Sequence, residues 1–168
     1  MEYISSDTNV WIDYNYIEKL EIPFRLECTY IMHHDAIDDE IKQPAELRGN
    51  LIKLDLVSVE LTTEEFYYAE KLGSQYRRLS IYDITALAIA AKRKITLLTG
   101  DKSLKKAAEA EGVTVIGTIG LLDRLLAEGC IDQKEYHECL IRFKENNGSK
   151  IRLPEEELDK RIKEWNKK

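Results

Sequence analysis

The apolar positions of the chain alternate between two kinds of spacing, one typical of strands and the other of helices. A strand-like run at 3–6 is followed, from about 8 to 20, by apolar side chains that share one helical face. Further strands are predicted at 27–32, 56–61, 95–99 and 113–117. The helices between them are predicted at 35–41, from 62 toward 72, from 80 through 91, and at 101–112.

Strands and helices in this order indicate an α/β protein with a mainly parallel central sheet and helices on both of its faces. After Gly117 the pattern becomes wholly helical, with helices predicted at 119–128, 132–146 and 154–166. We therefore expect a core domain over 1–128 and a helical C-terminal extension over 129–168, either packed on the core or projecting from it.

Length and composition support one globular domain. Hydrophobic residues make up 43% and charged residues 33% of the 168 positions, as in an ordinary globular protein. No apolar run approaches the roughly 18–20 residues of a membrane span, and the N-terminus lacks the basic and apolar regions of a signal peptide. Cys28, Cys130 and Cys139 have neither disulfide-framework nor zinc-ligand spacing. The sequence therefore predicts a cytoplasmic protein without a membrane partner.

Charge is divided unevenly along the chain. The formal net charge is −6, but residues 1–72 carry 16 acids and 6 bases, whereas residues 73–168 carry 15 acids and 19 bases. Several bases are clustered, at 77–78, 92–94 and 102–106. An acidic region beside basic patches suits a cation site that acts on a phosphate backbone, although clusters of this size are also common on solvated helix faces.

Acidic side chains follow the predicted strands or open the predicted helices. Asp7 comes directly after the first strand, and Asp101 follows the strand at 95–99. Because the carboxyl ends of parallel strands meet at one edge of the sheet, these carboxylates are expected to lie close together. Asp83 in the first turn of its helix and Glu40 in the short helix after the second strand could join them. Four such carboxylates would repel one another, and a hard divalent cation such as Mg²⁺ or Mn²⁺ would relieve that repulsion.

Each acid also has a purely local interpretation. Asp7 and Asp101 are favourable helix N-caps, and Asp83 suits the first turn of a helix. Glu40 could be a solvated helix residue like its acidic neighbours. The expected position of the acids at one rim of the sheet is what favours a shared site.

Other catalytic patterns do not fit the sequence. The residues TGDKS at 99–103 lack the upstream glycine of a phosphate-binding loop. Asn9 stands where a haloacid-dehalogenase-type phosphatase needs its second aspartate. His33 and His34 are adjacent, so on a strand they are expected to point to opposite faces rather than toward one metal ion. No Ser/His/Asp or Cys/His arrangement stands out.

Three stretches of the chain together resemble a known family. They are SSDTNVWID at 5–13, DDEI at 38–41 and LSIYDITALAIAAKRKITLLTGDKSLKKAAEAEGVTVIG at 79–117. This combination resembles the PIN domain, a family of metal-dependent nucleases, over residues 3 to 126. The segment that begins GTIGLLDRLLAEGCID is similar to the C-terminal helical part of VapC-like toxin ribonucleases. The resemblance implies a three-layer α/β/α PIN-like fold with a helical C-terminal extension.

The resemblance also implies roles for individual residues. The acids that would hold Mg²⁺ or Mn²⁺ are Asp7, Glu40, Asp83 and Asp101, and the polar residues that would assist them are Asn9 and Thr99. Asp35 and Asp39 compete with Glu40 for its place. The family often has another acid shortly after the last aspartate. Here that stretch is KSLKK, which leaves the number of cations open.

The activity implied by the family is hydrolysis of RNA by a metal-dependent endoribonuclease, with the toxin of a toxin–antitoxin pair as the first expectation. A small antitoxin and a second copy of the chain are then the expected protein partners. Lys102 and Lys105 could contact the phosphates of an RNA substrate. Two alternatives stay open: an inactive PIN-like binding module, and a housekeeping nuclease that processes RNA or DNA.

Overall fold

The protein, described by a computed structural model over residues 1–42 and 44–167, is built on one parallel sheet. In these residues the sheet has five strands, in the order β3-β2-β1-β4-β5. The strands are β1 (Tyr3–Ser6), β2 (Thr29–His33), β3 (Val57–Val59), β4 (Thr96–Leu98) and β5 (Val115–Ile116). All of their pairings are parallel, so their carboxyl ends lie at the same edge. The predicted mainly parallel sheet is confirmed.

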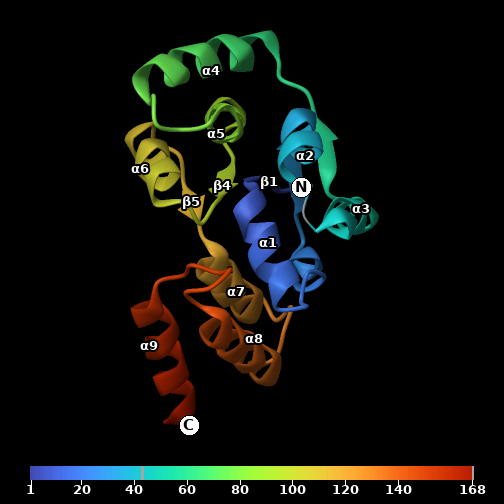
Figure 1. The fold of residues 1–168 in the computed structure, drawn as a ribbon, viewed down its shortest axis with the longest axis vertical. Coiled ribbons are helices and arrows are strands. Elements are labelled where there is room, and N and C mark those ends of the chain that lie inside the picture. Colours follow the sequence, from blue (N-terminus) through green and yellow to red (C-terminus); the bar gives the residue numbers. More distant parts are fainter. Residues whose placement is uncertain (43, 168) are drawn as a thin grey trace.

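Helices cover both faces of this sheet (Figure 1). They are α1 (Thr8–Tyr16), α2 (His34–Glu40), α3 (Ala45–Lys53), α4 (Thr63–Gln75), α5 (Ile81–Arg93), α6 (Lys102–Ala110), α7 (Thr118–Ala127), α8 (Gln133–Asn146) and α9 (Glu155–Asn166), with a short 3₁₀ helix η1 (Ile22–Arg25) after α1. Figure 1 shows α4, α5 and α6 on one side of the sheet and α1 and α7 on the other.

Two apolar clusters, one on each face, hold the three layers together. Leu97 of β4 belongs to the cluster under α4, α5 and α6, whereas its neighbour Leu98 belongs to the cluster with α1 and α7. Successive residues of a strand point to opposite faces, so both faces of the sheet are buried. Trp11 and Tyr14 of α1 are fully buried in the second cluster. The predicted three-layer α/β/α fold is confirmed.

Some predicted boundaries are wrong for local reasons. The first helix was expected to reach residue 20 but ends at Tyr16, because Glu18 adopts a left-handed backbone with φ of 60°. Ile17 and Leu20 are nevertheless buried, which explains their apolar character outside the helix. The pattern predicted neither η1 nor α3. Gly49 lies in the middle of α3, and a glycine weakens a helical pattern.

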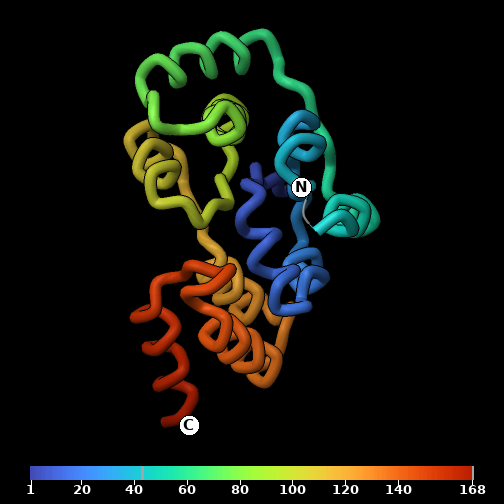
Figure 2. Tube along the Cα trace, viewed as in Figure 1, coloured from blue at the N-terminus to red at the C-terminus, as the bar shows by residue number. Residues whose placement is uncertain are grey.

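The described part of the C-terminal extension packs on the core. Cys139, Leu140 and Phe143 of α8 belong to the same apolar cluster as α1. The ring of Phe143 meets that of Tyr14 edge-on, with centroids 5.4 Å apart. Helix α9 follows α8 and carries the C-terminal end of the chain to the end of the long axis opposite α4 (Figure 2). The division into a core domain over 1–128 and an extension over 129–168 stays a proposal. Lys168 lies outside the described residues.

Among the residues that the structure describes, no helix is both long enough and apolar enough to cross a membrane.

Candidate active site

The carboxyl edge of the sheet brings Asp7 and Asp101 together through Thr99. In the β1–β4 pairing Ser6 lies opposite Leu98, so the residues that follow them, Asp7 and Thr99, leave the sheet side by side. The Thr99 hydroxyl donates a hydrogen bond to Asp7 Oδ2 (2.9 Å) and accepts one from the Asp101 N–H (3.1 Å). The predicted proximity of the two aspartates thus rests on one buried hydroxyl between them.

Glu40 reaches the same place from the end of α2. The Thr8 hydroxyl, in the first turn of α1, donates to Glu40 Oε1 (3.0 Å). The Thr8 N–H donates to Asp7 Oδ1 (2.8 Å), so Thr8 contacts both acids. A narrow pocket at this point is lined by Asp7 and Glu40, together with Tyr82 from α5.

Asp83 enters the group from the first turn of α5. Its Oδ2 atom accepts from the Ser80 N–H (3.1 Å), and its own N–H donates to the Ser80 hydroxyl (3.1 Å). This reciprocal pair is a capping box, and it fixes the position of Asp83 at the start of the helix. Asp101 caps α6 in a similar way, since its Oδ1 atom accepts from the Leu104 N–H (2.8 Å). The local interpretation of these acids as helix caps is therefore correct as far as it goes.

The acids also act on one another, which simple caps would not do. Burial raises the pKa of Asp7 to about 7, and the negative charges of Asp83 and Glu40 add to the rise against the hydrogen bonds from Thr99 and Thr8. Burial likewise raises the pKa of Glu40, with a further contribution from Asp83. Burial raises the pKa of Asp83, and the charge of Asp101 adds to it. Asp7, Glu40 and Asp83 each lie close enough to another acid for its charge to disfavour their ionised form.

The donor set has the chemistry that a hard divalent cation requires, although among the described residues no three of these acids bring ligand oxygens within 4.8 Å of one another. Among the described residues, Glu40 Oε2, Asp83 Oδ1 and Asp101 Oδ2 accept no hydrogen bond, so one oxygen of each carboxylate is available. Both oxygens of Asp7 accept one hydrogen bond each, and a carboxylate oxygen has a second lone pair. Mg²⁺ and Mn²⁺ prefer oxygen ligands such as those of carboxylates. The positive charge of either cation would offset the repulsion among the acids, which contributes to their raised pKa values.

A family model described as a PIN domain matches residues 3–167 of the chain. The chain belongs to the PIN-domain family. Neither a curated protein nor a solved structure matches it. The family match includes α8 and α9, in the segment that resembles the C-terminal helical part of VapC-like ribonucleases. A PIN domain is a nuclease fold that typically uses divalent metal ions, which agrees with the acids at its sheet edge.

The geometry of this PIN domain favours Glu40 over the two competing acids. Asp39 is exposed and accepts a hydrogen bond from the Tyr82 hydroxyl (2.9 Å), while Asp35 is exposed beside the histidines. Asn9 is exposed in the first turn of α1, and its side chain makes no hydrogen bond within the described part of the chain. A role for Asn9 therefore remains a prediction.

The expectation for the two histidines is wrong in its geometry. β2 ends at His33 and α2 begins at His34, so the rings do not point to opposite faces but lie with centroids 4.3 Å apart. With Asp35 they bring three potential ligand atoms within 4.8 Å of one another. We do not assign a cation there, because the group lies at the positive end of a short helix and His33 Nδ1 already accepts from the Asp35 N–H.

Two polar residues at the candidate site were not predicted from the sequence. Thr8 and Tyr82 contact Glu40 and its neighbour Asp39 across sequence separations of 32 and 43 residues. Their only signal in the sequence is their position, since each stands next to a predicted site aspartate. Asp13 is a different buried acid of α1, and its Oδ2 atom accepts from the Thr118 hydroxyl (2.8 Å). Burial raises the pKa of Asp13 to about 6.

Proposed function

We propose that this PIN domain is a metal-dependent endoribonuclease whose cation is held by Asp7, Glu40, Asp83 and Asp101. The observation that carries the proposal is the convergence of these four acids, from four different elements, at one edge of the sheet. Three of them have an oxygen without a hydrogen-bond donor among the described residues. Three of them also have a raised pKa, which indicates that their negative charges are poorly compensated by the protein alone.

The hydroxyl-bearing residues hold the acids at fixed positions. Thr99 sets the spacing of Asp7 and Asp101, and Thr8 orients Glu40. These contacts reduce the reorganisation that binding would require. When bound, Mg²⁺ or Mn²⁺ would supply concentrated positive charge to a phosphodiester and to the water molecule that attacks it.

Two lysines support contact with a nucleic-acid backbone. Lys102 and Lys105 are exposed in the first turns of α6, the helix that Asp101 caps. Neither forms an ion pair within the residues that the structure describes. Their charges are therefore available to phosphates that approach the acidic edge. Such contacts carry no base information, so they contribute affinity for a nucleic-acid backbone and leave the choice of cleavage site to other features.

The proposal is tested by incubating purified protein with total cellular RNA and Mn²⁺. Wild-type protein should give discrete fragments, and EDTA should abolish them. Asp7→Asn and Asp101→Asn should also abolish cleavage while leaving the fold intact, because Asn is as good a helix N-cap as Asp. Asp13→Asn is the matched control, since it neutralises another buried aspartate of α1 without touching the four acids. Full activity in Asp7→Asn or Asp101→Asn would overturn the assignment.

Within this class we propose the toxin of a toxin–antitoxin pair, which rests on the resemblance of the C-terminal segment to VapC-like ribonucleases. Induced expression in a bacterial host should then arrest growth, and Asp7→Asn should grow normally at the same protein level. Growth that continues with active wild-type enzyme would instead favour a housekeeping nuclease. Folded protein that neither cleaves RNA nor binds Mn²⁺ would favour an inactive binding module.

A further inference from the structure

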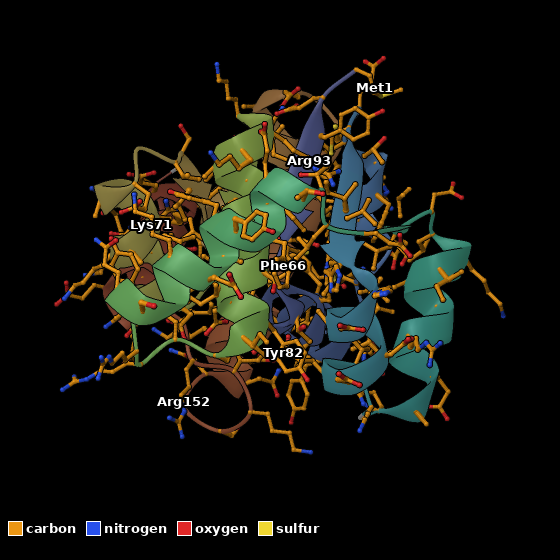
Figure 3. All side chains as sticks on the ribbon, turned by 90° about the horizontal axis from the view of Figure 1, so that it is seen from above. Met1, Phe66, Lys71, Tyr82, Arg93 and Arg152 are labelled. Carbon is orange, nitrogen blue, oxygen red and sulfur yellow. The ribbon has the colours of Figure 1, made fainter. Side chains whose placement is uncertain are left out.

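A side-chain hydrogen bond joins the two helices that carry Glu40 and Asp83. The hydroxyl of Tyr82, the second residue of α5, donates to Asp39 Oδ2 of α2 (2.9 Å). Figure 3 shows Tyr82 at the end of α5 that lies next to α2. In the part of the chain that the structure describes, this is the one side-chain hydrogen bond between α2 and α5.

Both ends of this bond are adjacent in sequence to a site acid. Tyr82 precedes Asp83, and Asp39 precedes Glu40. A shift of α2 away from α5 would therefore separate Glu40 from Asp83 directly. Glu40 has its own hydrogen bond to Thr8 of α1, but that contact does not restrain it relative to α5. Tyr82 also lines the narrow pocket beside Asp7 and Glu40, so the residue lies at the site itself.

The bond has an electrostatic effect as well as a geometric one. The charge of Asp39 is one of the causes that raise the pKa of Glu40, after burial and the charge of Asp83 and against the Thr8 hydrogen bond. The hydroxyl that donates to Asp39 holds this carboxylate in place. The hydrogen bond therefore keeps a fifth carboxylate beside the four acids at a fixed position.

We propose that Tyr82 is a positioning residue, whose hydrogen bond to Asp39 sets the separation of Glu40 and Asp83 and thereby strengthens cation binding. This inference rests on the proposed function, because it concerns the same four acids. Loss of the Tyr82 hydroxyl should therefore weaken binding of the cation. It should leave the stability of the fold unchanged, because the hydrogen bond is exposed to solvent.

The experiment is a calorimetric titration of the full chain with Mn²⁺. Tyr82→Phe removes the hydroxyl and keeps the ring, and Asp39→Ala removes the acceptor. The matched control is Tyr76→Phe, because the Tyr76 hydroxyl also donates to a carboxylate, that of Glu111 (2.7 Å), at the far end of α6 from Asp101. Asp7→Asn reports separately on whether Mn²⁺ binds at the four acids at all.

Tyr82→Phe should bind Mn²⁺ about three-fold more weakly than wild type, as expected for the loss of one partly solvated hydrogen bond. Tyr76→Phe should bind as wild type does. In the Asp39→Ala background, Tyr82→Phe should have no further effect, because its partner is already gone. Tyr82→Phe and Tyr76→Phe should unfold in urea at the same midpoint, which separates positioning from general destabilisation.

Three results would overturn the positioning role: wild-type affinity in Tyr82→Phe, an equal loss in Tyr76→Phe, or an undiminished loss in the Asp39→Ala background. In each of these, Mn²⁺ binding that depends on Asp7 would still support the proposed function. If wild-type protein binds no Mn²⁺, or if Asp7→Asn binds it as well as wild type does, the cation site fails and the role of Tyr82 fails with it.

Discussion

Replacing Asp7 by Asn should make the metal-free protein more stable at alkaline pH. Burial raises the pKa of Asp7 from 3.8 to about 7, so the folded state disfavours the ionised carboxylate. Each pKa unit corresponds to about 1.4 kcal/mol, which gives a cost of roughly 4 kcal/mol once the group is ionised. Asn is neutral at every pH and has the same shape, so it avoids this cost.

The pH dependence follows from proton binding in the two states. Between the unfolded pKa and the folded pKa, the folded protein holds a proton on Asp7 that the unfolded chain has lost. The free energy of unfolding therefore falls as the pH rises from about 4 to about 7, and it stays low above that range. Asn offers one carbonyl oxygen to two donors, the Thr8 N–H and the Thr99 hydroxyl. One weakened hydrogen bond costs about 1–2 kcal/mol, which leaves a net gain of about 2–3 kcal/mol near pH 8.

The assay is urea unfolding in EDTA near pH 5 and pH 8, repeated with Mn²⁺ in place of EDTA. Asp13→Asn is the control, because Asp13 is buried, accepts from a threonine hydroxyl and has a pKa that burial raises to about 6. Both variants should gain stability near pH 8. Wild type and Asp13→Asn should then be stabilised further by Mn²⁺, and Asp7→Asn should not. If Asp7→Asn is no more stable than wild type near pH 8, or if Mn²⁺ stabilises it equally, the reasoning is refuted.

Three further substitutions test other contacts. Thr99→Val removes the hydroxyl between Asp7 and Asp101 and should lower RNA cleavage at least about ten-fold, with the pH optimum shifted upward; an unchanged pH profile would contradict this. Phe143→Ala should lower the free energy of unfolding in urea by about 3–5 kcal/mol, and a loss below about 1 kcal/mol would show that α8 does not share the core. Glu65→Gln should cost about 1–3 kcal/mol at neutral pH, because hydrogen bonds from Arg93 and Thr62 lower the pKa of Glu65 against its burial. That difference should vanish as the pH falls below the folded pKa of Glu65, and a constant difference would argue against the ion pair.

The sheet and the position of two site acids could be predicted from sequence because both follow from local order. Alternating strands and helices indicate a parallel sheet, and Asp7 and Asp101 come shortly after strands. Ser80 and Asp83 were recognised as a helix start because a capping box has a fixed spacing. Helix α3 was not recognised, since Leu47 and Leu51 are its only buried residues.

The rest of the site depends on contacts that no local pattern encodes. Glu40 joins Asp7 because Thr8 reaches it across 32 residues, and Tyr82 meets Asp39 across 43 residues. The arrangement of the two histidines was mispredicted for a related reason. Whether a strand ends at His33 or continues through His34 is decided by the start of α2, and a shift of one residue reverses the direction of a side chain.

The most direct test of the central claim is anomalous diffraction from crystals of the wild-type protein soaked with Mn²⁺. The account predicts an anomalous peak within coordination distance of Asp7, Glu40, Asp83 and Asp101. A peak at His33, His34 and Asp35 without one at the acids would contradict the assignment. So would a crystal that shows no peak near the carboxyl edge of the sheet at saturating Mn²⁺.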